Sequence, residues 1–446
     1  MILYHRFKKN AKIRAIIAKS WAVSWPMTLI MFFVFLIGLT DVYIAGKFGK
    51  DVQAAYGIVF QLYFIFSIVA SALSIGTVSV ISRLFTSGRK QEYEEAVYTS
   101  FISGAVSGLI LSAAGIIVSG SVIRILNIPS GPREYAVSFM KLYSIGLLAN
   151  YILLNTNAIL RACSMIRKSL ITMFVVCCVN IALNFFLVFH TPLSFRGIAL
   201  ATIISMSIGG LMNAAYLKAI LLKGHTFSWQ CIQKIIAISW PSAVLQVLWQ
   251  VGTVVLFMVL SFLPRDNVET MAAFTNGLKV ESAIFLPAFA FNMANAVVVG
   301  NLLGKKEKED AFRGGIITGV LGVGVVVLLT LIVMLNAGYV SSILSNNSIV
   351  VEECRKYIYI SLLSEPFMAW GVILSGGLNG AGDTRSVMFI VALSMWFIRL
   401  PLSYILSITF GWGASAVWWA MNTSVLVQTV FLTWRYFSKR WMDCAE

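Results

Sequence analysis

The tripeptide Ser-Trp-Pro occupies Ser24–Pro26 and returns at Ser239–Pro241, 215 positions later. Each copy opens a long apolar stretch. The same spacing separates Glu94–Ala96 (EEA) from Glu309–Ala311 (EDA), and each of these acidic segments follows a further long apolar run. A chain that repeats an apolar plan in this way is typical of membrane bundles that arose by duplication, an architecture common among transporters.

The composition predicts an all-α polytopic membrane protein. Hydrophobic residues make up 59% of the chain and charged residues 12%, with a mean hydropathy of +0.85, whereas soluble domains carry about 25% charged residues. The apolar runs lack the alternation of a barrel strand, which favours helices. Twelve spans of about 20 residues or more are predicted, at 20–44, 56–82, 97–121, 136–160, 169–190, 197–221, 237–262, 272–300, 312–336, 356–378, 387–410 and 413–436.

Six spans in each half is an even number, so both halves start on the same side of the membrane. We therefore expect two parallel six-helix bundles related by a pseudo-two-fold axis along the membrane normal. The predicted division is an N-terminal bundle at 1–222, a cytoplasmic linker at 223–236 and a C-terminal bundle at 237–446. The cleft between two such bundles is the expected substrate path.

The net charge of +16 raises the question of nucleic-acid binding, and its distribution argues against it. Most Lys and Arg residues fall in the segments that lie inside if the N-terminus is cytoplasmic. That bias follows the positive-inside rule and predicts a multi-pass protein of the cytoplasmic (inner) membrane with both termini in the cytoplasm. The positive charge is then a topology signal and a contact with anionic lipid headgroups, and no nucleic-acid partner is expected.

Asp41 is one of three acidic residues that fall inside apolar spans, together with Glu281 and Glu365. A carboxylate at the centre of a bilayer costs about 2.5–3.5 kcal/mol on insertion scales, so it persists when it is paired, protonated or facing water. Asp41 is therefore a candidate proton or cation site, although its place near the outer end of the first span also suits an interfacial carboxylate. Pro26, in the same span, removes a helical hydrogen bond and can bend the helix, or can simply mark a helix start.

Asn180 and Asn184 are four positions apart on the fifth span and so share one helix face, and Thr202 lies on the sixth span. Asn and Thr in membranes commonly hydrogen-bond between helices. The alternative is that these three side chains and Asp41 form a four-oxygen site, which suits a hard cation such as Na⁺ or a proton on Asp41. Sequence spacing leaves both readings open, and no other metal site is expected.

The second half carries a different set of polar residues. Glu281 lies on the eighth span, Glu365 on the tenth and Arg399 on the eleventh. A buried Arg needs a partner, so a structural ion pair is favoured over a coupling site. Four amide side chains are candidates for lining a substrate cleft: Gln246, Gln250, Asn276 and Asn292.

Several stretches resemble the multidrug and toxic compound extrusion (MATE) transporters. Pro26 followed by Asp41–Gly46 (DVYIAG) is similar to the first helix of that family. Gly380–Arg385 (GAGDTR) with Ile398–Leu402 (IRLPL) resembles the stretch that joins its tenth and eleventh helices. Asn180 with Leu183–Asn184 is similar to its fifth helix. The likeness covers essentially the whole chain.

The resemblance implies an antiporter that exports organic cations, drugs or toxic metabolites by alternating access, driven by an inward Na⁺ or H⁺ gradient. It is closer to the DNA-damage-inducible-F-like branch than to the NorM-like branch. In the former branch the coupling site maps to Asp41, Asn180, Asn184 and Thr202, although members often have Asp where this chain has Asn184. The acid that the NorM-like branch places on its seventh helix has no counterpart among Gln246 and Gln250.

Two other functions are weighed against export. A lipid-linked oligosaccharide flippase would share the duplicated plan, but its pyrophosphate substrate favours a cavity rich in Arg and Lys, and only Lys141, Lys279 and Arg399 lie deep in predicted spans. A channel or receptor-like protein would show no dependence of flux on a counter-cation. No nucleophile–base set, metal box, nucleotide-binding loop or cofactor motif indicates an enzyme. We expect a monomer without a cofactor that uses Na⁺ or H⁺ as its coupling ion.

Overall fold

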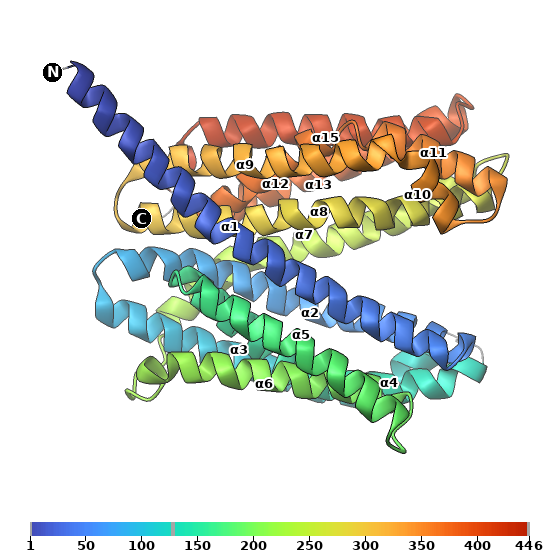
Figure 1. Cartoon of the computed structure of the whole chain (residues 1–446), viewed down its shortest axis with the longest axis horizontal. Coiled ribbons are helices and arrows are strands. Elements are labelled where there is room, and N and C mark those ends of the chain that lie inside the picture. Colours follow the sequence, from blue (N-terminus) through green and yellow to red (C-terminus); the bar gives the residue numbers. More distant parts are fainter. Residues whose placement is uncertain (1, 126–129, 444–446) are drawn as a thin grey trace. The chain divides into compact units, whose positions relative to one another are not determined.

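The computed structural model describes residues 2–125 and 130–443. Within these ranges the chain is almost entirely helical and contains no strand, as Figure 1 shows. Ten helices are long and apolar enough to cross a membrane, or eleven if one bent pair counts as a single span. The predicted all-α polytopic membrane fold is therefore confirmed.

The first half folds into six long helices. Their bounds are α1 Ile2–Lys47, α2 Lys50–Thr86, α3 Lys90–Ile125, α4 Ser130–Ala162, α5 Ile166–Phe189 and α6 Arg196–Leu221. Helix α4 lies at the centre of this half, because it packs against α2, α3 and α6. Helices α5 and α6 pack against each other, and this pairing positions the polar residues predicted on the fifth and sixth spans.

The second half contains more, and shorter, elements. The long helices are α7 Trp229–Ser261, α8 Asn267–Gly304 and α9 Lys308–Leu335, followed by α10 Ala337–Leu344, α11 Ser348–Ser361, α12 Glu365–Gly380, α13 Thr384–Leu393, the π-helix η1 Ser394–Arg399, α14 Leu400–Tyr404, the π-helix η2 Ile405–Thr409, α15 Ala414–Phe437 and the 3₁₀ turn η3 Arg440–Met442. Helix α8 packs against α9, α11 and α12.

The predicted tenth span, 356–378, falls on a bent pair of helices that together are long and apolar enough to cross a membrane. The two helices, α11 and α12, meet at an angle of 55° across a short break. Pro366 stands in the first turn of α12, where its missing N–H is tolerated. Pro366 has no N–H to donate to the Leu362 carbonyl four residues earlier, and its ring crowds that carbonyl, so a continuous helix is disfavoured here and the chain turns at residues 362–364.

Two more predicted spans differ in detail. The eleventh is a continuous helical segment, Thr384–Thr409, with a π-helical stretch on each side of α14, which carries Pro401. The twelfth corresponds to α15, which is 24 residues long but polar enough to fall outside the apolar spans. That α15 forms the twelfth membrane span therefore stays a prediction.

The chain groups into two compact units by its internal contacts. One unit holds residues 1–28 and 244–446, and the other holds Leu29–Ala243. The contact groups thus change inside α1 and inside α7, two residues after Pro26 and two residues after Pro241. The division at 1–222, 223–236 and 237–446 is based on the sequence repeat and not on contacts, and it stays a prediction. The helix α7 begins at Trp229, so the second part of the predicted linker is helical.

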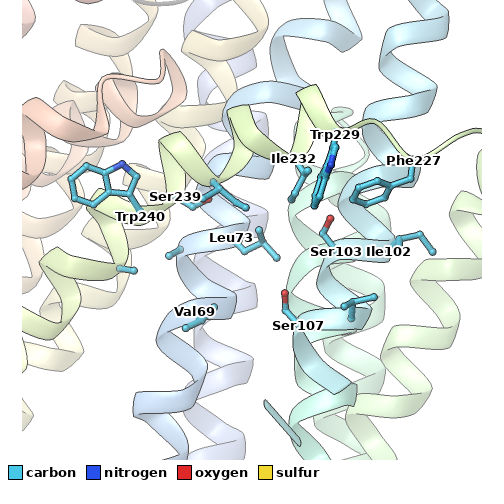
Figure 2. Close-up of a pocket in the computed structure, with 14 residues that line it drawn as sticks. Val69, Leu73, Ile102, Ser103, Ser107, Phe227, Trp229, Ile232, Ser239 and Trp240 are labelled. Carbon is cyan, nitrogen blue, oxygen red and sulfur yellow. The ribbon is translucent and has the colours of Figure 1, made fainter. Parts of the chain in front are cut away.

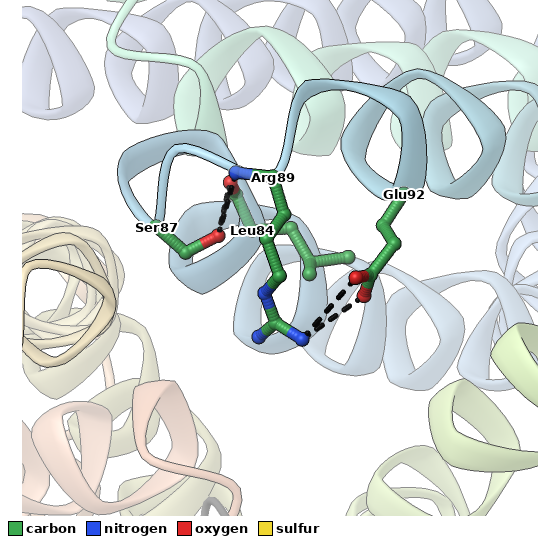
Figure 3. Close-up of polar contacts among 4 residues, drawn as sticks. All are labelled: Leu84, Ser87, Arg89 and Glu92. Carbon is green, nitrogen blue, oxygen red and sulfur yellow. Dashed lines mark hydrogen bonds and ion pairs between the residues drawn. The ribbon is translucent and has the colours of Figure 1, made fainter.

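The turn between α2 and α3 shows how short loops connect these helices. Gly88 adopts a φ of +80°, which glycine tolerates because it lacks a Cβ. Ser87 Oγ donates to the Leu84 carbonyl at 3.0 Å and accepts from the Arg89 N–H at 3.4 Å, as Figure 3 shows. Arg89 also pairs with Glu92 at 3.1 Å. These local contacts reverse the chain within a few residues.

Candidate cation-coupling site

Asp41 lies in the last third of α1 and is 3% exposed. The next turn of the helix carries Ile44 and Ala45, which are fully buried in the hydrophobic core of the first half. The apolar packing of this part of the helix therefore buries the Asp41 carboxylate. A buried carboxylate requires compensation by hydrogen bonds or a bound cation.

Helices α5 and α6 supply the hydrogen bonds. Asn184 Nδ2 donates to Asp41 Oδ1 at 2.7 Å, and Thr202 Oγ1 donates to Asp41 Oδ2 at 3.2 Å. The two asparagines are linked by a bond from Asn184 Nδ2 to Asn180 Oδ1 at 3.1 Å, and Asn180 Nδ2 donates to Thr202 Oγ1 at 3.2 Å. The structure thus joins the four side chains that the sequence singled out into one closed ring.

The close packing of α5 and α6 makes this ring possible. Asn180 and Asn184 lie on one face of α5 because four residues make about one helical turn. Gly197, in the first turn of α6, lies directly against the backbone of α5, and a Cβ there would stand 2.9 Å from the carbonyl carbon of Leu187. A larger residue at position 197 would push α6, and with it Thr202, away from Asp41.

Two tyrosines also belong to the site. The Tyr56 hydroxyl lies beside Asp41, and the Tyr143 hydroxyl lies beside Tyr56 and Thr202. Both are buried, and neither makes a hydrogen bond of normal geometry. The sequence held a usable signal for Tyr56. Asp41 is six residues from the end of α1 and Tyr56 is six residues from the start of α2, so a tight turn between antiparallel helices brings them to one level. No comparable spacing points to Tyr143 on α4.

The ring leaves one strong acceptor unused. Asn184 is fully buried, and its Oδ1 has no hydrogen-bond partner. A buried carbonyl oxygen without a partner is costly. Together with the two carboxylate oxygens and the Thr202 hydroxyl, it forms a set of oxygen ligands that suits a hard cation, and the carboxylate alone suits a proton. These oxygen ligands therefore fit both coupling ions predicted from the sequence, Na⁺ and H⁺.

The second half places its acidic residues near one another. Glu281 on α8 lies beside Tyr357 and Ser361 of α11 and interacts electrostatically with Glu365 at the start of α12. Glu365 is buried, and its Oε2 has no hydrogen-bond partner, as is true of the Tyr357 and Ser361 hydroxyls. All members of this polar group belong to the contact unit of residues 1–28 and 244–446, whereas Asp41 belongs to the unit Leu29–Ala243.

Arg399 ends the π-helix η1 and is buried. Its Nε donates to Ser424 Oγ at 2.9 Å, and its guanidinium stands 5.1 Å from the ring centre of Trp249. Glu281 also attracts it electrostatically. Whether these charges serve as a structural pair or in coupling stays a prediction, and the aromatic partner Trp249 was not singled out from the sequence.

The predicted cleft residues and Pro26 lie outside the polar groups described above. Asn292 Nδ2 donates to the Val372 carbonyl at 2.6 Å, and Asn276 Nδ2 donates to the Leu344 carbonyl at 3.4 Å, so both amides join helices to neighbouring segments. Gln246 and Gln250 are half-buried on α7. Pro26 is buried inside α1, which stays helical on both sides of it. Their predicted roles in a substrate cleft and in helix bending stay predictions.

Comparison with known proteins gives a consistent result. The family model MatE matches the chain twice, at 26–186 and 241–405. The two matches begin at Pro26 and Pro241, which are the prolines of the repeated tripeptide. The duplication read from the sequence is therefore confirmed by the family model, which recognises each half separately.

Relatives cover nearly the full chain. The "Probable multidrug resistance protein NorM" of Thermotoga maritima is 23% identical over 420 residues, which is 91% of this chain and 89% of that protein. The "Uncharacterized transporter YisQ" of Bacillus subtilis is 20% identical over 433 residues, or 95% and 94% of the two chains.

Solved structures share the fold. A MOP superfamily transporter from Pyrococcus furiosus superposes with a TM-score of 0.88 at 18% identity, covering 95% of this chain and 97% of that one. A multidrug resistance MATE family transporter described in an outward-facing conformation gives a TM-score of 0.86 at 19% identity with the same coverage. With two family matches that together span most of its length, the chain belongs to the MatE family, the multidrug and toxic compound extrusion transporters that its sequence resembles.

Proposed function

We propose that this protein is a cation-coupled antiporter that exports organic cations, drugs or toxic metabolites by alternating access. The observation that carries the proposal is the ring around Asp41. A single buried carboxylate holds hydrogen bonds from Asn184 and Thr202, and the Asn184 carbonyl oxygen beside it lacks a partner. Such a site gains stability when a proton or a Na⁺ ion arrives, and loses it when the cation leaves.

The coupling step follows from charge. An occupied site is neutral and compatible with an apolar core, whereas an empty site leaves an ionised carboxylate among helices α1, α5 and α6. Cation arrival from one side of the membrane therefore stabilises one arrangement of α1 relative to its partners. Each charge that crosses the membrane contributes about 2.3 kcal/mol per 100 mV, in addition to its concentration gradient. Exporting the substrate against its own gradient requires this input.

The proposal includes the location and partners predicted from the sequence. The protein would lie in the cytoplasmic membrane with both termini inside, work as a monomer and bind no nucleic acid. The names of its relatives as multidrug resistance proteins support a drug-like substrate. The residue pattern around Asp41 supports closeness to the DNA-damage-inducible-F-like branch. The multidrug resistance relatives carry the name NorM, which is that of the other branch.

The test is transport in proteoliposomes with pH and Na⁺ gradients imposed separately, with a cationic dye and an anionic metabolite as substrates. The Asp41→Asn variant keeps the shape of the side chain and removes its charge, so we expect gradient-driven dye efflux to fall to the level of empty liposomes. The variant should still insert and purify as a single species. Undiminished coupled efflux by Asp41→Asn would overturn the assignment.

A further inference from the structure

The contact unit Leu29–Ala243 contains a cavity of about 500 Å³. Its walls come from α2, α3, the segment before α7 and the first part of α7, as Figure 2 shows. None of its fourteen lining residues is charged. Apart from indole N–H groups, its polar groups are the hydroxyls of Ser103, Ser107 and Ser239, and Ser103 Oγ donates to the Thr99 carbonyl of its own helix at 2.7 Å.

The cavity is long and opens onto apolar surface. Phe227 and Trp229 lie at one end, and Val69 and Ser107 lie at the other (Figure 2). Trp229 to Ala243 on α7 covers fourteen steps, about 21 Å at 1.5 Å per residue. Trp229 is 70% exposed and Val106 is 48% exposed, so the lining continues into the apolar exterior of the spans. For comparison with this length of about 21 Å, half of a membrane's hydrocarbon core, which is the depth of one lipid leaflet's acyl chains, measures about 15 Å.

The two halves of the chain differ at this place. The repeat relates α3 to α9, and α7 to α1, by 215 positions, while Arg83–Phe85 and Asn301–Leu303 relate α2 to α8 by 218 positions. Three residues of the cavity wall therefore have counterparts in the other contact unit, namely Leu73 with Phe291, Ser107 with Gly322 and Ile236 with Trp21.

Aromatic rings occupy the corresponding place in the other contact unit. The Phe291 side chain packs directly against Gly322, where a Cβ would stand 2.8 Å from the ring, and the Phe291 and Trp21 ring centres are 6.4 Å apart. In the contact unit Leu29–Ala243, Leu73 and Ile236 are smaller and leave the space open. The cavity thus arises from particular side chains and not from the duplicated backbone plan.

We propose that this cavity binds one acyl chain of a membrane phospholipid, with the lipid headgroup outside, beside Phe227 and Trp229. An acyl chain loses no hydration on entering an uncharged wall, whereas a cationic drug would lose its water without meeting a counter-charge. Trp side chains are enriched at membrane–water interfaces, where a headgroup lies. The opening onto the apolar exterior makes the cavity continuous with the surface that the spans present to lipid.

The test uses the full chain in nanodiscs made with a phospholipid that carries a photoreactive diazirine at the end of one acyl chain. After illumination, mass spectrometry locates the label. Because the diazirine is at the end of the chain far from the headgroup, we expect labelled peptides from α2 around Val69–Leu73 and from α3 around Val106–Ser107. The Ser107→Trp variant fills the cavity and should reduce this labelling at least fivefold. The control Ile117→Trp, at an outward-facing position of the same helix, should leave it unchanged.

Two outcomes would overturn the proposal. One is equal labelling of the cavity peptides in wild type and Ser107→Trp. The other is loss of the label when a cationic dye is added at saturating concentration, which would make the cavity a substrate site. Ser103→Leu, a smaller change in the same wall, is the second variant if Ser107→Trp does not purify as a single species, and it should lower the labelling at least twofold.

Discussion

Position 184 decides how much negative charge the candidate site holds. Asn184 gives Asp41 a hydrogen bond at 2.7 Å, and an aspartate at this position would place a second carboxylate beside the first. With an amide at this position, the ring around Asp41 carries one negative charge when empty. The single charge limits the electrostatic attraction for a cation, and it also limits the repulsion that an empty site must bear in the core.

We expect Asn184→Asp to tighten cation binding. Two carboxylates at hydrogen-bond distance repel each other in a buried setting, and a bound proton or Na⁺ relieves that repulsion. The half-saturating concentration of the coupling cation should fall about tenfold, equivalent to about 1.4 kcal/mol. The measurement is dye efflux from proteoliposomes as a function of external Na⁺ and of external pH.

A matched control adds the same charge at another place. Asn213 on α6 is also fully buried, and it donates to Thr156 and Asn157 and not to Asp41. Asn213→Asp should lower thermal stability without changing the half-saturating cation concentration. An equal shift in both variants, or none in Asn184→Asp, would contradict the account of the Asp41 ring.

At the scale of elements, each half has an ion pair between the segment that follows its last long helix and the start of its third helix. In the first half, Glu94 at the beginning of α3 pairs with Lys223 at 2.8 Å and lies 3.3 Å from His225. In the second half, Glu309 at the beginning of α9 pairs with Lys439 at 2.5 Å. Glu94 and Glu309 are equivalent in the repeat, so the duplication preserved an ion pair that neither half's apolar pattern reveals.

We expect Glu94→Gln to loosen the segment between α6 and α7. The substitution removes the charge that holds Lys223 and His225, while the neighbouring bond from the Ser228 N–H to Thr99 Oγ1 remains. Trypsin should cleave after Lys223 several times faster than in wild type, as followed by gel electrophoresis over time. Glu92→Gln breaks the exposed pair with Arg89 on the same turn of α3 and serves as the control, because it should leave cleavage at Lys223 unchanged. Identical cleavage rates in all three proteins would contradict the role of Glu94.

Helices α1 and α7 are each shared between the two contact units. The units change after Thr28 and after Ala243, two residues beyond Pro26 and Pro241. Proline leaves a carbonyl of the preceding turn without its helical partner and weakens the helix locally. The repeated Ser-Trp-Pro thus marks, in both copies, the place where a continuous helix passes from one set of packing partners to the other.

At the scale of the whole molecule, the positive-inside bias makes a direct prediction about topology. In a cysteine-free background, Asn346→Cys between α10 and α11 should react with a membrane-impermeant maleimide on intact cells. Thr226→Cys between α6 and α7 should react only after permeabilisation. Both side chains are exposed, so access to the reagent alone decides labelling. The reversed pattern would place the termini outside and contradict the orientation read from Lys and Arg.

Most of the fold could be predicted from the sequence, because long apolar runs have few alternatives to spanning helices. The exceptions are local. Pro366 bends the tenth predicted span because a proline cannot donate the hydrogen bond that would continue the helix through Leu362, and the resulting 55° angle depends on how α11 and α12 pack. The span predicted at 413–436 corresponds to α15, whose composition is too polar to identify it as a membrane span.

The sequence by itself determined the helical membrane class and the duplication, since these follow from composition and from spacing along one chain. It also named Asp41, Asn180, Asn184 and Thr202 as candidates, through the apolar setting of Asp41, the spacing of the two asparagines and the resemblance to a known family. Only the tertiary structure decided that the four side chains meet, that Tyr56 and Tyr143 stand beside them, and that Phe291 fills in one half the space that Leu73 leaves open in the other. Contacts between helices depend on how closely neighbouring backbones approach, as at Gly197 against α5. Periodicity along one helix carries no record of that approach.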